Sequence, residues 1–103
     1  MAVKFTLIPS PTFKADVKIP YAGGKEGELT FTFKHKPMDE LAALESKEDL
    51  LNIDLMMEII AGWALPDEFN RENMEVLLNN YPQAGIAITK EYHSQILGLR
   101  IKN

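Results

Sequence analysis

Alternating apolar and polar positions mark the first third of the chain as β structure. Apolar side chains occupy every second position in residues 13–19 and again in residues 29–33, with Lys, Asp and Thr between them. A period of two places one set of side chains on one face of a strand. The glycine-rich stretch 20–27 separates the two runs, so we predict a β-hairpin with one buried face, joined by a loop longer than a two-residue turn. Residues 3–7 alternate in the same way until Pro9.

From Pro37 onward the apolar residues recur with helical spacing. Pro37 suits the first turn of a helix over residues 37–44. A pattern close to a capping box, from Ser46 to Asp49, predicts the start of a second helix that reaches residue 63. Asn70 is a typical N-cap for a third helix, and a fourth follows Pro82. In the third helix the apolar positions 74, 77, 78 and 81 keep the spacing of a single buried stripe.

These patterns together predict an α+β fold. The N-terminal β-hairpin occupies residues 1–36, with or without a third strand, and packs against about four C-terminal helices in residues 37–103. A length of 103 residues is typical of one domain, so we expect residues 1–103 to form a single domain.

The predicted helix over residues 46–63 is apolar on nearly its whole circumference. One stripe includes Met56, Ile60 and Trp63, and we take Trp63 as core. Leu51, Leu55 and Ile59 form a second stripe, with Gly62 beside it. Such a helix is buried on both sides. Two interpretations remain open: the second stripe packs inside the chain, or it contacts a partner or a second copy.

Composition narrows the class of partner. The formal net charge is −4, the isoelectric point is near 5.1, and the basic residues are scattered, which argues against a nucleic-acid surface. The chain has no cysteine, so disulfides, thiolate metal sites and cysteine nucleophiles are excluded. The apolar run 1–9 is too short for a signal peptide, and polar residues interrupt the run 50–65, so we expect no membrane contact.

Candidate chemistry is sparse. His35 and His93 lie far apart in the sequence, and a zinc site needs three or four ligands. Asp54 and Glu58 are one helical turn apart; a shared metal or proton is one interpretation, and a solvated helix face is the other. Residues 23–25 (GGK) lack the other parts of a phosphate-binding loop. We therefore expect no catalytic residue, no cofactor and no metal, and a protein that binds other proteins.

An ordered series of short segments carries a family resemblance. The series keeps its order and spacing over nearly the whole chain, and it consists of residues 11–14 (PTFK), 19–20 (IP), 31–35 (FTFKH), 39–43 (DELAA), 62–63 (GW), 67–70 (DEFN), 77–82 (LLNNYP) and 99–103 (LRIKN). In this series the chain resembles the tail assembly chaperones of long-tailed bacteriophages and prophages.

The resemblance implies a non-enzymatic protein of the host bacterial cytoplasm. Members of the family keep the long tail tape measure protein soluble, bring the tail tube protein to it, and are absent from the mature virion. Five methionines, with Met56 and Met57 adjacent, fit an adaptable binding surface, and they fit a core equally well. We expect self-association through Leu51, Leu55, Ile59 and Gly62, through an edge strand, or through both.

Two other classes of function remain open. The chain is also compatible with a small structural tail component, such as a terminator or connector subunit. A regulatory DNA-binding module would need a basic helix face, and Arg100 and Lys102 are too few to form one.

Overall fold

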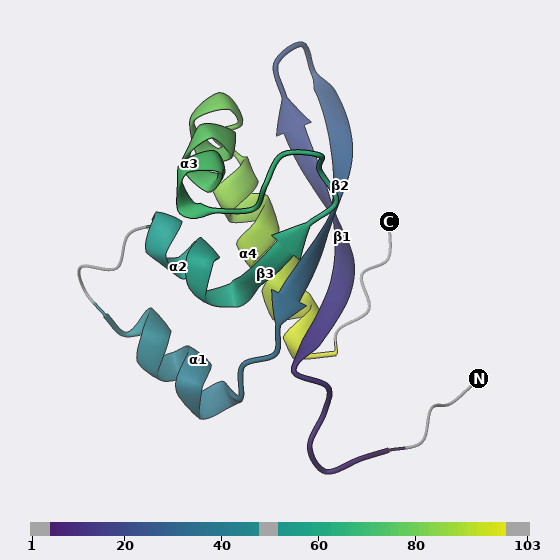
Figure 1. Ribbon diagram of the computed structural model, residues 1–103, viewed down its shortest axis with the longest axis vertical. Helices are drawn as coiled ribbons and strands as arrows, with labels where there is room; N and C mark the ends of the chain where they lie inside the picture. Colours follow the sequence, from purple (N-terminus) through teal and green to yellow (C-terminus); the bar gives the residue numbers. More distant parts are fainter. Residues whose placement is uncertain (1–4, 48–51, 99–103) are drawn as a thin grey trace.

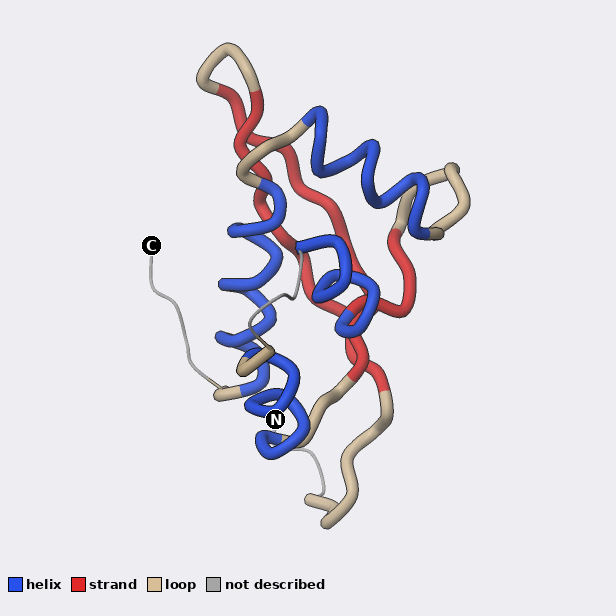
Figure 2. The backbone as a smooth tube through the Cα atoms, turned by 90° about the vertical axis from the view of Figure 1, so that its left-hand side faces the viewer, coloured by secondary structure: helices blue, strands red, loops and turns tan. Residues whose placement is uncertain are grey.

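The computed structural model describes residues 5–47 and 52–98 of the chain. Two long strands, β1 (Thr12–Tyr21) and β2 (Lys25–Lys34), form the predicted antiparallel hairpin. Four helices follow: α1 (Met38–Glu45), α2 (Asn52–Ile59), α3 (Arg71–Asn80) and α4 (Ala84–Ile96). The helices lie on the same side of the sheet (Figures 1 and 2). The predicted α+β class, a sheet with about four helices, is confirmed.

The turn of the hairpin is shorter than the sequence predicts. Tyr21 pairs with Lys25, so only residues 22–24 connect the two strands. Gly23 and Gly24 have φ angles of 93° and 71°, values that glycine adopts without the steric cost other residues incur. The loop is thus longer than a two-residue turn, as predicted, but it is confined to residues 22–24 rather than the stretch 20–27, because two left-handed glycines reverse the chain within three residues.

A third strand, β3 (Ile60–Trp63), lies inside the region predicted to be helical. It pairs with β2, giving the order β1-β2-β3, and the described residues 5–11 contain no strand. The predicted helix over residues 46–63 is therefore wrong at its C-terminal end, and the third strand that the sequence left open lies within the predicted helical region 37–103. The predicted capping box is wrong at its first residue, because Ser46 is the C-cap of α1.

A β-bulge explains why β3 resembles a helix in the sequence. Trp63 pairs with Phe31 and Ile60 pairs with Phe33, so a register shift places one extra residue between them. In a regular strand, residues three apart point to opposite faces, but a bulge restores both to one face. The i, i+3 spacing of Ile60 and Trp63 therefore fits a bulged strand as well as a helix.

The core lies between the inner face of the sheet and the helices. Its fully buried side chains include Phe31 and Phe33 of β2, Met56 of α2, Met74 of α3 and Ile88 of α4, among others. The alternate side chains of β1 are exposed on the outer face. Of the stripe predicted for the third helix, Met74 is buried and Leu77 and Leu78 pack against the core, whereas Tyr81 is exposed.

Helices α1 and α3 begin next to the residues that the sequence predicts at their N-termini. Pro37 is the N-cap residue of α1. At α3, the Asn70 side chain accepts a hydrogen bond from the Asn73 N–H at 2.8 Å, which satisfies one of the free donors of the first turn.

Tyr92 of α4 links the helices to the end of β2. Its hydroxyl donates to the Lys34 carbonyl oxygen at 2.8 Å and accepts from the Lys36 N–H at 3.2 Å. Burial of the hydroxyl, opposed by the Lys36 hydrogen bond and reinforced by the negative charge of Glu45, raises the pKa of Tyr92 from 10.0 to about 12. The folded state therefore favours the protonated phenol.

We expect Tyr92→Phe to lower the free energy of unfolding by about 1 kcal/mol at neutral pH, because two hydrogen-bonding groups lose a partner. Because the pKa of Tyr92 is raised, the difference in stability between the wild type and Tyr92→Phe should also depend on pH. The contribution of Tyr92 to stability is complete below its unfolded pKa near 10 and is lost as pH rises toward about 12. Denaturant unfolding at pH 8 to 12 should show the wild type losing its advantage over Tyr92→Phe. A constant difference across that range would contradict the assignment.

Candidate functional site

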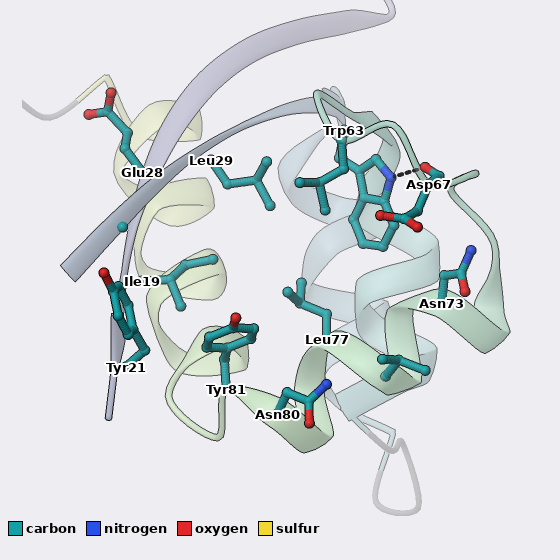
Figure 3. Close-up of a pocket in the computed structure, with 13 residues that line it drawn as sticks. Ile19, Tyr21, Glu28, Leu29, Trp63, Asp67, Asn73, Leu77, Asn80 and Tyr81 are labelled. Carbon is teal, nitrogen blue, oxygen red and sulfur yellow. Dashed lines mark hydrogen bonds between the residues drawn. The ribbon is translucent and has the colours of Figure 1, made fainter. Parts of the chain in front are cut away.

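The described part of the chain forms an open apolar cavity between the tip of the hairpin and α3, which we call the Trp63 groove (Figure 3). Its volume is about 410 Å³, within the range of clefts that hold ligands, roughly 300–1,000 Å³. It is lined by residues from three parts of the fold: Ile19, Tyr21, Gly27, Glu28 and Leu29 from the hairpin; Trp63, Leu65 and Asp67 from β3 and the loop after it; and Asn73, Val76, Leu77, Asn80 and Tyr81 from α3 and its C-cap.

Alternation in the hairpin produces one wall of this groove. Ile19 and Leu29 lie on the inner face, which helices cover further along the sheet. Ile19 pairs with Gly27, which has no side chain to fill the space. A Cβ atom added at Gly27 would lie 3.5 Å from Cε1 of Tyr21, an ordinary contact. The groove is therefore open partly because position 27 is glycine.

The loop between β3 and α3 forms the opposite wall and is held by hydrogen bonds at both ends. Trp63 Nε1–H donates to the Asp67 carbonyl oxygen at 2.8 Å, as Figure 3 shows. The Ala64 N–H donates to the Thr30 carbonyl oxygen at 3.0 Å, and Asn73 Nδ2 donates to the Glu68 carbonyl oxygen at 2.7 Å. These contacts fix the indole at the groove, where it is half-buried.

Aromatic rings define the two ends of the groove. The rings of Tyr21 and Tyr81 meet edge to face with centroids 6.2 Å apart. At the other end, the Trp63 ring packs edge to face on Phe69, with a centroid separation of 5.1 Å. Tyr21, Leu65, Val76 and Tyr81 are each at least 36% exposed although they are large and apolar. Exposed apolar residues gathered around a cleft are typical of a binding surface.

The wall formed by residues 64–80 is acidic. It contains Asp67, Glu68, Glu72 and Glu75 against one cation, Arg71. The Arg71 guanidinium already pairs with Asp54 of α2, with Nη2 at 2.9 Å from Oδ1. No lysine or arginine is among the residues that line the groove. The groove is therefore lined by apolar side chains and two carboxylates, Asp67 and Glu28, and it adjoins an acidic segment.

The four residues predicted to bind a partner do not form one surface. Leu51 lies outside the described residues. Leu55 is half-buried against the core, Ile59 is 1% exposed, and Gly62 lies in β3. A helix running through all four positions would align them, but α2 ends at Ile59. Of the three that lie in the described part of the chain, Leu55, Ile59 and Gly62, none lines the Trp63 groove.

His93, Asp54 and Glu58, considered above as candidate metal or proton-transfer groups, each contact a different partner. His93 Nε2 is 2.6 Å from Glu45 Oε2, a contact that joins α4 to α1. Glu58 pairs with Lys36 at 3.3 Å, and Asp54 pairs with Arg71. Within residues 5–47 and 52–98, no group of three or more His, Asp or Glu side chains could hold a metal ion. No helix in those ranges is long and apolar enough to cross a membrane.

Signals for the groove are weak in the sequence. The apolar spacing places Trp63 and Tyr81 in core stripes, and the glycine-rich stretch places Tyr21 in a loop. Val76 and Leu65 carried the usable signal, because they are large apolar residues that fit neither the stripe of α3 nor any other predicted core position. The residues that line the groove come together only because β3 pairs with β2 in this register. A helix over residues 60–63 does not predict that pairing.

Comparison with known proteins assigns the family. The family model described as phage tail assembly chaperone matches residues 1–103. Searches of curated proteins and of solved structures find no significant match. The match covers the whole chain and agrees with the resemblance carried by its short segments. The chain therefore belongs to the phage tail assembly chaperone family.

Proposed function

We propose that this protein is a non-enzymatic chaperone that binds the tail tape measure protein and helps recruit tail tube subunits in the host cytoplasm. The observation that carries the proposal is the family match over residues 1–103. The family establishes a role in tail assembly, and the identity of the two partners is our inference.

Two exposed apolar surfaces support binding to protein chains. One is the Trp63 groove. The other is the segment before β1, where Phe5, Leu7 and Ile8 are almost fully exposed and the chain leads away from the sheet (Figure 1). A long chain with apolar stripes aggregates unless those stripes are covered, and reversible apolar contacts cover them without a chemical step.

The tape measure protein of the same phage or prophage provides the direct test. We expect co-expression with the chaperone to move the tape measure protein from the insoluble to the soluble fraction, and the two to elute together in size-exclusion chromatography. An unrelated acidic protein of similar size is the control. A tape measure protein that stays insoluble in both cases, with no complex, would contradict the proposal.

Mass spectrometry of purified phage particles separates the chaperone from a structural tail component. A chaperone is released during assembly, so the chain should be absent from particles while the tube protein is abundant. Detection at a fixed ratio to tail subunits would favour the terminator or connector alternative.

We also propose that the chaperone self-associates, and the structure favours an edge strand over the Leu55 stripe. Within the described residues, no strand pairs with the outer edge of β1. The His35 N–H donates to the Pro11 carbonyl oxygen, beside the Thr12 and Lys34 pair. In an antiparallel ladder this directs the backbone groups of Lys14, Asp16 and Lys18 toward the open edge. Pro20 occupies the same edge, where its missing N–H costs no hydrogen bond.

Lys18→Pro tests the edge, because it removes an outward donor without removing a bond to β2. Light scattering should show wild-type oligomers that grow with concentration, and Lys18→Pro should reduce them while Lys18→Ala does not. Leu55→Glu is expected to lower stability, because Leu55 packs against the core. A wild type that remains monomeric at high concentration would refute self-association.

A further inference from the structure

We propose that the Trp63 groove binds a protein segment that presents large apolar side chains with an adjacent lysine or arginine. This inference rests on the proposed function, because it assigns a site and a chemistry to the chaperone's contact with the tape measure protein. The groove supplies the apolar contacts, and the acidic wall beside it supplies the preference for a cation.

The lining of the groove is mainly apolar. Among the described residues that line it, Glu28 and Asp67 are the only charged side chains, and the cavity is open to solvent. Val76 and Leu65 expose side chains that a bound anchor would cover, and burying apolar surface is the main favourable term in such binding. A mostly apolar site with a few polar groups at its margin is typical of peptide and ligand sites.

The preference for a cation is assigned to the Trp63 end of the groove. The carboxylate of Asp67 lies beside the indole of Trp63 at the same end of the groove (Figure 3). Glu72 lies one helical turn before Val76, so it also faces this side of α3. Arg71 is engaged by Asp54 across the α2 interface. A cation on the bound segment meets a carboxylate and an aromatic ring together, an arrangement that suits arginine in particular.

The chain carries its own reporter for this site. Trp63 is the only tryptophan, and it lines the groove. Its fluorescence should therefore change when the groove is filled. Synthetic peptides that cover the apolar helical segments of the tape measure protein are the probes, with affinity measured from the anisotropy of a labelled peptide.

Val76→Asp and Ile86→Asp form a matched pair for the groove. Both residues are helical, β-branched and exposed, at 51% and 56%, but only Val76 lines the groove. We expect Val76→Asp to weaken peptide binding about tenfold or more, as for a central apolar contact, and Ile86→Asp to bind as the wild type does. Equal affinity of Val76→Asp and wild type would overturn the groove assignment.

Gly27→Val tests the same site without adding charge. The new side chain fills the floor of the groove, and a β-branched residue suits a strand better than glycine does. We expect lost binding with thermal stability at least equal to that of the wild type. Retained binding by a folded Gly27→Val protein would overturn the proposal even if Val76→Asp failed to fold.

Asp67→Lys and Glu40→Lys test the charge preference. Each changes the net charge by the same amount, but Asp67 lines the groove, whereas Glu40 is an exposed residue of α1 and does not line it. The Trp63 hydrogen bond reaches the Asp67 backbone, so it survives the substitution. We expect Asp67→Lys to weaken binding about two- to fivefold, the range of a partly exposed ion pair, and to do so less for a peptide whose basic residue is replaced by Glu. Equal effects of the two variants would overturn the cation preference.

These outcomes separate the inference from the function on which it rests. If the wild-type chain keeps the tape measure protein soluble while Val76→Asp and Gly27→Val do so equally well, the groove assignment fails and the chaperone role stands. If the wild type binds no tape measure segment and does not solubilise the full-length protein, the proposed function fails with it.

Discussion

Two buried phenylalanines of the middle strand hold this fold together. Phe31 and Phe33 are fully buried on the inner face of β2, and β2 is the strand that pairs on both sides. Phe33 contacts Tyr92 of α4, with ring centroids 5.3 Å apart, and Phe31 contacts Trp63 of β3 at 6.4 Å. The same two residues therefore connect the last helix to the strand that ends at the groove.

The contact between Phe31 and Trp63 also determines where the Trp63 groove lies. Trp63 opposes Phe31 across the bulged β2–β3 ladder, and its indole hydrogen bond then fixes the loop that leads to α3. The hairpin completes the groove with an inner face that glycine leaves partly unfilled at position 27. The apolar floor is thus an extension of the core into solvent.

Local signals predicted the parts of the fold that depend on neighbouring residues. The alternation around Phe31, the proline at the start of α1 and the Asn70 cap each act through the residues next to them, and each prediction is confirmed. The end of α2 is different. Ile60 and Trp63 satisfy both a helical period and a bulged strand, and only pairing with Phe31 and Phe33, distant in the sequence, decides between them.

The candidate site was less predictable for the same reason. The groove joins residues from the hairpin, β3 and α3, and none of these segments has a binding motif of its own. In a helix that continued through residue 63, Leu55 and Ile59 would lie on one apolar stripe, either packed inside the chain or in contact with a partner. The change to strand at Ile60 ends that stripe and leaves Ile59 in the core. Short ordered segments of the sequence carry the family resemblance. The position of the binding surface follows only from the fold, because the surface combines segments that are distant in the sequence.

We propose that this member of the tail assembly chaperone family contacts its partner through the Trp63 groove. Amide NMR spectra of the isotope-labelled chaperone, recorded with and without an apolar segment of the tape measure protein, locate the contact surface residue by residue. We expect the largest shift changes in residues 19–29, 61–67 and 73–81, with α1 and the C-terminal half of α4 unchanged. Changes concentrated on α1, α4 or residues 5–8, with the groove unaffected, would contradict it.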